Sequence, residues 1–364
     1  AKCVVPLFLC YWLPMLLSSF DSVMPQTSWI HTLAALRFAA AAVTMAVLLR
    51  EDSVRQRVVR WVAVLLLFWA FDAFVQLLFG TDLLGTPMNP DRLNGIFTRQ
   101  YQFFGPTLAI LSPLLLEYAR RHWPAWAWVG VFALTFGAVL IAGMRAGWLM
   151  MALLVGAYMV MMLKQKDWRQ RKFALAIPAT VVVTLFTAYL VSPLFQARLE
   201  QTLTATKGSY PALEAASTLR LPIFSTSLAI FRAHPVNGAG VRAFPKAYMT
   251  YAKPDDIHLR RSGGKSGASH AHNLVLEVMA DTGVIGLAGL LAGCFLAWRL
   301  WRAMDPAARY AALPFSLALG LLLFPLNSYF AIYGTYLSSL TWVLFGLWAA
   351  CFNRKTAPLP PDAS

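Results

Sequence analysis

The sequence predicts an all-α integral membrane protein: a multi-span helical bundle of about 10–12 transmembrane helices with one large helical loop outside the membrane. Apolar residues make up 59% of the 364 positions and charged residues only 13%, whereas soluble domains carry roughly a quarter charged residues. Long apolar runs recur along the chain, and an 81-residue basic stretch over residues 193–273 interrupts them.

Each apolar run is long enough for one helical span, since a span needs about 20 consecutive apolar residues. We expect ten spans, and between two of them an amphipathic helix over 193–206 that lies on the membrane surface. The ten predicted spans are about 3–20, 29–49, 61–80, 101–118, 123–143, 147–163, 173–192, 284–301, 310–326 and 335–352.

Short basic segments between the spans predict the orientation, because such loops mark the cytoplasmic side. They alternate with segments poor in Lys and Arg, so both termini are expected to be cytoplasmic and residues 193–273 to lie on the opposite side. The first span lacks a small-residue cleavage site, so no cleavable signal peptide is expected. The basic segments are Arg50–Arg60, Arg120–Arg121, Lys164–Lys172, Arg299–Arg309 and Arg354–Lys355.

These spans predict four segments along the chain. Residues 1–192 hold seven transmembrane helices, and residues 193–273 form the loop domain that carries the candidate site residues. Residues 274–352 hold three further transmembrane helices, and residues 353–364 form a cytoplasmic tail.

The loop domain contains ten Lys or Arg residues and four Asp or Glu residues. A basic domain at a membrane surface suits an anionic, lipid-bound substrate, and a positively charged tether is the alternative. We expect a helix from a Ser217 cap to about Ala233 and another over 244–251. Ser269 is expected to cap a helix through Ala280, which Gly283 interrupts before the next span.

His272 is the candidate general base. We place it in the first turn of its helix, where the helix dipole and nearby arginines disfavour an imidazolium and leave a neutral, basic imidazole. The alternative is a histidine that hydrogen-bonds the loop backbone. A spacing of two on a helix puts His270 on a different face from His272. Asn273 is expected to orient a substrate or to cap the helix.

Arg145 lies in a very short turn between two spans, Gly143–Gly147, which holds its guanidinium at the bilayer edge. Arginine recognises phosphate through a rigid fork of donors, and a snorkelling arginine is the alternative. Further candidates are Arg220 and Arg242 in the loop domain and Arg92 in the 81–99 loop. Each of these three is otherwise an ordinary solvated charge.

Metal and cofactor chemistry is not expected. Arginines would therefore have to neutralise the negative charge that develops during the reaction. The chain has no spaced carboxylate pair, no Gly-rich phosphate loop and no Cys/His ligand spacing. Asp21 is a lone candidate ligand. The four cysteines lie within apolar spans, where they are expected to be core residues. The positive charge is divided between both sides of the membrane, so nucleic acid is not an expected partner.

Four motifs in order along residues 90–290 resemble the O-antigen ligase and polymerase superfamily of bacterial membrane glycosyltransferases. Arg92-Leu93-Asn94-Gly95-Ile96-Phe97 resembles its Arg-x-x-Gly-x-Phe stretch, and Met144-Arg145-Ala146-Gly147-Trp148 resembles its Ser-Arg-Gly-Ala-Trp turn with Met in place of Ser. His234-Pro235-Val236-Asn237-Gly238-Ala239-Gly240 is similar to its His-Pro-x-x-Gly-x-Gly region. His272-Asn273 with Leu276-Glu277 resembles its His-Asn-x-x-Leu-Glu signature.

The resemblance implies a ligase, because Arg145, Arg220 and His272 are spaced like the Arg, Arg and His of such enzymes. It implies a multi-span bundle of the membrane glycosyltransferase type in the bacterial inner membrane, with the active site facing the periplasm. The implied reaction transfers a glycan, with inversion, from undecaprenyl pyrophosphate to a sugar hydroxyl of the lipid A-core oligosaccharide. Arg145 and Arg220 would then bind the donor pyrophosphate.

Three other functions stay open from sequence. An O-antigen polymerase would use a second lipid-linked glycan as acceptor, and a protein O-oligosaccharyltransferase would use a Ser or Thr hydroxyl. A lipid-linked oligosaccharide transporter would bind the same donor without chemistry, but it would be expected to place charges along a path inside the spans. Only Arg37 and Asp72 lie well inside spans, which favours an enzyme.

Overall fold

The computed structural model describes residues 3–90, 92–97, 103–164, 168–209, 212–214, 217–328 and 331–353, without the side chains of 168–175, 207 and 353. Within these ranges the regular structure is helical, with two isolated bridges, Thr81 to Pro87 and Asn89 to Arg92, in place of strands. The predicted all-α class is therefore confirmed. The predicted tail lies outside the described residues from position 354 onward.

Each predicted span coincides with a helix. By length and composition, four helices among the described residues can cross a membrane (α2, α3, α6 and α13), or five if the bent pair formed by α7 and α8 counts as one span. A helical membrane protein is confirmed, and the span count of 10–12 stays a prediction. The helices are α1 Val4–Ser19, α2 Pro25–Leu48, α3 Asp52–Phe79, α4 Phe104–His122, α5 Ala125–Ile141, α6 Arg145–Leu163, α7 Trp168–Val191, α13 Leu274–Ala303, α14 Pro306–Leu322 and α15 Thr335–Ala350.

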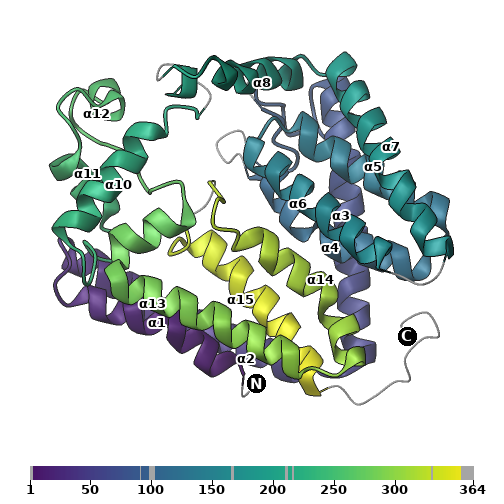
Figure 1. The fold of residues 1–364 in the computed structure, drawn as a ribbon, viewed down its shortest axis with the longest axis horizontal. Helices are drawn as coiled ribbons and strands as arrows, with labels where there is room; N and C mark the ends of the chain where they lie inside the picture. Colours follow the sequence, from purple (N-terminus) through teal and green to yellow (C-terminus); the bar gives the residue numbers. More distant parts are fainter. Residues whose placement is uncertain are drawn as a thin grey trace. The chain divides into compact units, whose positions relative to one another are not determined.

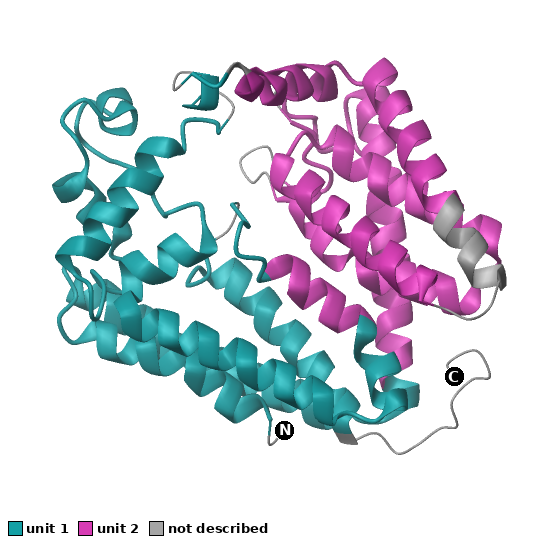
Figure 2. Ribbon diagram, viewed as in Figure 1, with its two compact units in different colours: residues 1–54, 207–313, 323–364 teal, residues 55–206, 314–322 magenta. Residues whose placement is uncertain are grey.

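The chain divides into two compact units (Figure 2). Unit 1 comprises residues 1–54, 207–313 and 323–364, and unit 2 comprises residues 55–206 and 314–322. The four segments predicted from sequence are defined by where the chain is expected to cross the membrane, whereas the two units are defined by contacts between residues. The segment boundaries therefore stay a prediction.

Unit 1 is built on α1, α2, α13 and α15, which lie side by side (Figure 1). Small residues permit the close approach: a Cβ at Gly289 of α13 would lie 2.3 Å from the Cys10 carbonyl oxygen of α1, and one at Gly346 of α15 would lie 2.9 Å from the Ala42 carbonyl oxygen of α2. The helices of the loop segment in this unit are α10 Leu221–Ala233, α11 Phe244–Tyr251 and α12 Ile257–Arg261, and α10 packs on α13.

The predicted interruption at Gly283 is confirmed. Gly283 has φ 63° and ψ −154°, a conformation open to glycine, and it breaks the hydrogen-bond ladder of α13. The segment 235–240 replaces the lost bonds. Pro235 and Val236 accept from the N–H groups of Val284 and Ile285, while Ala239 and Gly240 donate to the carbonyls of Ala280 and Asp281. The His-Pro-x-x-Gly-x-Gly region thus fixes the loop segment to the kink.

Unit 2 contains α3 to α7, and its chain turns sharply at Ser192. The second part of α7 and the segment 193–206 are bent by 108°. This segment comprises α8, Pro193–Leu203, and the 3-10 helix η1, Thr204–Lys207. The Ser192 side chain caps α8 by accepting a hydrogen bond from Phe195 N–H. The predicted helix at 193–206 is present, and it runs in a different direction from α7 because of the bend.

Two predicted helix starts are wrong. Asn273, not Ser269, caps the helix before Gly283, since its side-chain oxygen accepts from Leu276 N–H at 3.0 Å and α13 begins at Leu274. The helix expected from Ser217 begins only at Leu221, because Thr218 and Leu219 both have positive φ. The capping role expected as one possibility for Asn273 is thus present.

Candidate active site

His270 and His272 lie against each other just before α13. Their ring centroids are 3.8 Å apart and the rings are tilted by 42°. His272 has φ 51° and precedes the cap residue Asn273, so it is outside the helix. The expectations that His272 occupies the first helical turn and that the two rings face apart are therefore wrong.

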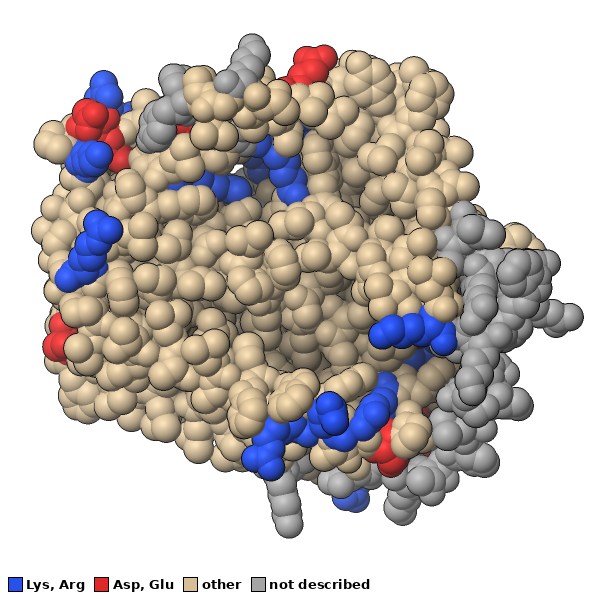
Figure 3. Space-filling model, in the orientation of Figure 1, with Lys and Arg blue, Asp and Glu red and all other residues tan. Residues whose placement is uncertain are grey.

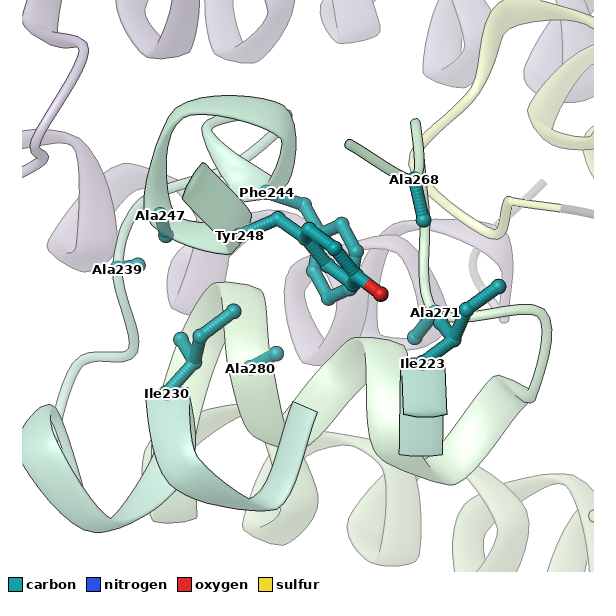
Figure 4. Packing of buried hydrophobic residues seen from close by; sticks show 9 residues of the cluster. All are labelled: Ile223, Ile230, Ala239, Phe244, Ala247, Tyr248, Ala268, Ala271 and Ala280. Atoms are coloured by element: carbon teal, nitrogen blue, oxygen red, sulfur yellow. The ribbon is translucent and has the colours of Figure 1, made fainter. Parts of the chain in front are cut away.

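The reason is that the segment before α13 is irregular, so helical spacing does not apply to it. Outside a helix, side chains two positions apart can point to the same side. Ala271 between the two histidines is fully buried in a cluster of nine residues from the loop segment and α13 (Figure 4). The buried alanine fixes the segment and leaves both imidazoles on the other side. The cluster is Ile223, Ile230, Ala239, Phe244, Ala247, Tyr248, Ala268, Ala271 and Ala280.

Ser328, in the connection between α14 and α15, joins His272 to Arg220. The Arg220 guanidinium donates to Ser328 Oγ at 2.7 Å, and the His272 ring forms a hydrogen bond with the Ser328 backbone. Asn273 donates from its side-chain amide to the Pro325 carbonyl at 3.2 Å, which attaches the same connection to α13. We call His272, His270, Arg220 and Ser328 the imidazole cluster.

A chain of buried and partly buried hydrogen bonds leads to the residue before Arg220. Tyr248 donates to Asp256 at 2.9 Å, and Asp256 caps α12 by accepting from the N–H groups of His258 and Leu259. His258 Nε2 then bonds the Leu219 carbonyl at 2.9 Å, next to Arg220. This carbonyl can only accept, so Nε2 of His258 carries a hydrogen. The hydrophobic core of the loop segment is thereby coupled to the arginine.

The pKa of His272 is lowered from 6.5 to about 3, and burial is the main cause. The charges of His270, Arg220 and, least, His258 act in the same direction, and the Ser328 backbone opposes them. The imidazole is therefore neutral at physiological pH. Its Nδ1 atom is buried and has no hydrogen-bond partner among the described residues. A neutral imidazole with an unused lone pair is the form that a general base requires.

Arg242 lies against the carboxylates of α13. Its backbone N–H donates to Asp281 Oδ2 at 3.0 Å, and its positive charge acts on both Asp281 and Glu277. This contact helps to hold the segment 235–242 on the kink of α13. The hydrogen bond uses the backbone of residue 242, and the guanidinium acts on the two carboxylates through its charge.

Arg145 is at the centre of a second group of candidate residues, in unit 2. Its guanidinium donates to Gln201 Oε1 at 3.0 Å, and Arg198 donates to the same oxygen at 3.1 Å. The charges of Arg198 and Arg92 both act on Arg145. Two guanidinium groups that share one amide oxygen, with the charge of Arg92 acting on one of them, favour a multiply charged anion. We call Arg145, Arg198, Arg92 and Gln201 the arginine cluster.

The turn before α6 fixes the position of Arg145, which is the first helical residue. Gly143 has φ 71°, and Met144 is extended, so the chain reverses between α5 and α6 within three residues. Trp148 Nε1 donates to the Leu140 carbonyl at 3.1 Å across this turn, and its ring lies 5.0 Å from that of Phe195 on α8. The short turn expected from sequence is present, and Trp148 links it to α8.

Sequence reasoning missed Arg198, Gln201 and Ser328. Arg198 and Gln201 are three residues apart on α8 and hence share a helix face, a signal that was available in the amphipathic pattern. Ser328 follows a proline in a short connection, and nothing in its sequence context distinguishes it. Its role depends on a tertiary contact with residues more than fifty positions away.

No group of three His, Cys, Asp or Glu side chains that could hold a metal ion occurs among the described residues. Asp21, the lone ligand candidate, accepts a hydrogen bond from Asn237 at 3.1 Å. On the face seen in Figure 3 most atoms belong to uncharged residues, and Lys and Arg form small groups. The chemical candidates in the described residues are therefore imidazole and guanidinium groups, and metal independence stays a prediction.

Residues 130–291 match the family model described as O-antigen ligase. The match confirms the predicted resemblance to the O-antigen ligase superfamily for this part of the chain, which is less than half of its length and includes Arg145, Arg198, Arg220 and His272. No curated protein and no solved structure matches the chain.

The match shows that residues 130–291 are similar to the O-antigen ligase family. The superfamily implies a glycosyltransferase-like enzyme of O-antigen processing, with lipid-linked glycan and lipid A-core as substrates in general. The apolar helices agree with a multi-pass membrane protein. Arg92 lies outside the matched residues.

Proposed function

We propose that this protein is an O-antigen ligase, which transfers a glycan from undecaprenyl pyrophosphate to a sugar hydroxyl of the lipid A-core oligosaccharide. We further propose that the protein acts in the inner membrane, with its active site on the periplasmic face and both termini in the cytoplasm. The observation that carries the proposal is the buried, neutral imidazole of His272 beside Arg220, within the residues that match the O-antigen ligase family.

His272 is the proposed general base. Nδ1, which has no partner among the described residues, accepts the proton of the acceptor hydroxyl. The acceptor oxygen attacks the anomeric carbon as the bond from that carbon to the pyrophosphate oxygen breaks, with inversion. Undecaprenyl pyrophosphate leaves with the bonding electron pair. Because Nδ1 is buried, acceptor binding has to open the space beside it.

Arg145 and Arg220 are the proposed ligands of the donor pyrophosphate, with Arg198 as an addition from the structure. Pyrophosphate needs no general acid to leave, because guanidinium groups can stabilise its growing negative charge. Arg145 and Arg198 already share an acceptor, Gln201 Oε1, so a phosphate oxygen can replace that amide oxygen. Arg92 would add longer-range charge.

His270 is proposed to hold the His272 ring in place, since the two rings are in contact. Asn273 has a structural role, because its two polar ends cap α13 and bind Pro325. Asp72, one of the two charges inside the predicted spans, accepts from Leu83 N–H at 2.8 Å. A carboxylate used to fix a loop supports an enzyme over a transporter with a charged path.

The test is reconstitution of purified protein with an undecaprenyl-pyrophosphate-linked glycan and one acceptor at a time. The lipid A-core oligosaccharide should yield a glycosylated product. A product that forms only with a second lipid-linked glycan would indicate a polymerase, and one that forms only on a Ser- or Thr-containing protein would indicate an oligosaccharyltransferase. Donor binding or movement across vesicles without any product would overturn the enzyme.

A further inference from the structure

Arg37 is a cation inside α2, a helix long and apolar enough to cross a membrane. It lines a cavity of about 140 Å³ in unit 1, together with residues of α1, α2 and the start of α15. Tyr11, His31, Tyr333 and Thr335 contribute polar groups to the lining. The proposed transfer reaction uses none of these residues.

Arg37 makes two weak contacts with described residues. Its guanidinium donates to Thr335 Oγ1 at a long 3.4 Å and lies 4.9 Å from the centre of the Phe38 ring. No carboxylate of a described residue lies within ion-pair distance of it. A guanidinium has five N–H donors, and Arg37, which lines the cavity and is exposed, uses one of them in the Thr335 contact.

His31, also on α2, adds a second polar group to the cavity lining. Its Nδ1 bonds the Thr27 carbonyl at 2.9 Å, and since a carbonyl only accepts, Nε2 remains for another partner. Ala34 and Ala35 lie between His31 and Arg37 along the cavity wall. Their small side chains leave the space that larger residues would fill.

The cavity lies where α15 begins. α15 has 16 residues, which gives it a length of about 24 Å against a hydrocarbon core of about 30 Å. As one of the predicted spans, it must therefore begin close to a membrane boundary. Arg37 reaches Thr335, the first residue of α15, because helical side chains lean toward the N-terminus. The guanidinium thus lies level with the start of α15, the predicted boundary of that span, which Arg37 reaches by snorkelling from within α2.

We propose that Arg37 and His31 form a binding site for an anionic phospholipid. The phosphodiester accepts hydrogen bonds from the Arg37 guanidinium, and the head group occupies the cavity beside Ala34. The acyl chains lie along the exposed apolar side chains of the same helix, Ile30, Leu33 and Leu36. Such a lipid would attach the start of α15 to α2, next to Tyr333, whose hydroxyl bonds Thr282 of α13 at 2.8 Å.

The test measures how much lipid the purified protein retains from mixed micelles, by native mass spectrometry. The probes are phosphatidylglycerol, phosphatidylcholine, undecaprenyl phosphate and inorganic phosphate, each at the same concentration. Phosphatidylglycerol should be retained best. Arg37→Gln should reduce its retention by about tenfold, the loss of one charge-assisted hydrogen-bonded contact, and Arg37→Lys by less.

Two further variants separate a site from diffuse charge. Ala34→Leu fills the cavity and keeps the charge of Arg37, so it should also reduce lipid retention. This variant keeps the test valid if Arg37→Gln does not fold. Arg50→Gln, which removes an exposed arginine just after α2, should retain as much lipid as the original protein. Unchanged retention in both Arg37→Gln and Ala34→Leu would overturn the site. Preferential retention of undecaprenyl phosphate would overturn the assignment to a phospholipid.

Discussion

The imidazole cluster of unit 1 and the arginine cluster of unit 2 differ in the backbone that holds them. His272 and the residues before Arg220 lie in irregular segments, with positive φ at Thr218, Leu219 and His272. Arg145 and Arg198 lie on α6 and α8, with a glycine turn before Arg145. Irregular backbone needs a surrounding core to fix it, whereas helices position side chains by their own geometry.

The two clusters also differ in the solvent exposure of their reactive atoms. His272 is half-buried, like Arg145 and Arg198, but its Nδ1 atom is fully buried and the pKa of its ring falls to about 3. A dry imidazole suits proton transfer, and partly exposed guanidinium groups suit capture of an anion. We propose a division of roles among the residues, in which His272 is the base and Arg145 and Arg198 provide most of the anion binding. The following predictions can break or sharpen this division.

The largest effect is expected from His272→Ala. Loss of the proposed base should lower the rate of glycan transfer by about 10²–10⁴-fold. The measurement is turnover of purified protein with lipid-linked glycan and lipid A-core oligosaccharide. His122→Ala, at the end of α4, serves as the control and should be near wild type. Near-wild-type turnover by His272→Ala would remove this histidine from the mechanism.

Substitutions in the arginine cluster should have the next largest effect, and on binding. Arg145→Lys and Arg198→Gln should each weaken donor binding by about 10–100-fold, since hydrogen bonds to charged groups contribute roughly 1.5–3 kcal/mol. Lys should not fully replace Arg145, because an ammonium lacks the planar fork. Exposed Arg50→Lys is the matched control. Full donor affinity in both test variants would show that the cluster supplies only diffuse charge.

Gly283→Ala tests the dependence of unit 1 on its kink. An added Cβ would lie 2.2 Å from the Val236 carbonyl oxygen, and the φ of 63° is unfavourable for alanine. We expect destabilisation by several kcal/mol, on the order of a strained core substitution. Gly320→Ala, with nothing within 4 Å of its added Cβ, should leave the midpoint of thermal unfolding unchanged or raise it slightly. Equal midpoints for the two variants would contradict the role of Gly283.

The pH dependence of kcat/KM should reflect the lowered pKa of His272. The base is active when neutral, so with a pKa of about 3 it should cause no loss of activity between about pH 8 and pH 5. In His270→Ala, a neighbouring charge and part of the burial are lost, so the pKa of His272 should rise toward 6.5. Activity at pH 5 should then fall relative to pH 8. A wild-type inflection near pH 6.5 would argue against a buried base.

The smallest effect is expected from metal removal. Because guanidinium groups are proposed to stabilise the leaving group, excess EDTA should leave transfer unchanged, and added Mg²⁺ or Mn²⁺ should change it little. Loss of activity in EDTA that Mg²⁺ restores would contradict the arginine-only account. Asp21→Asn would then be the next variant to measure.

Much of the fold was predictable because apolar runs and glycine positions act locally. Run length predicted where the helices lie, and Gly283 predicted the break in α13. The arrangement of His270 and His272 was not predictable, since it depends on Ala271 being buried against residues from α10, α11 and α13. The helical spacing rule failed there because the segment is not helical. Likewise Ser328 becomes important only through the folded contact with Arg220.

Donor binding measured without acceptor tests the division of roles most directly. Two variants, His272→Ala and Arg145→Lys, would be compared with wild type for binding of the undecaprenyl-pyrophosphate-linked glycan. The account predicts an unchanged dissociation constant for His272→Ala, despite its lost turnover, and a dissociation constant raised by about tenfold or more for Arg145→Lys. Weakened binding in His272→Ala together with full binding in Arg145→Lys would contradict it.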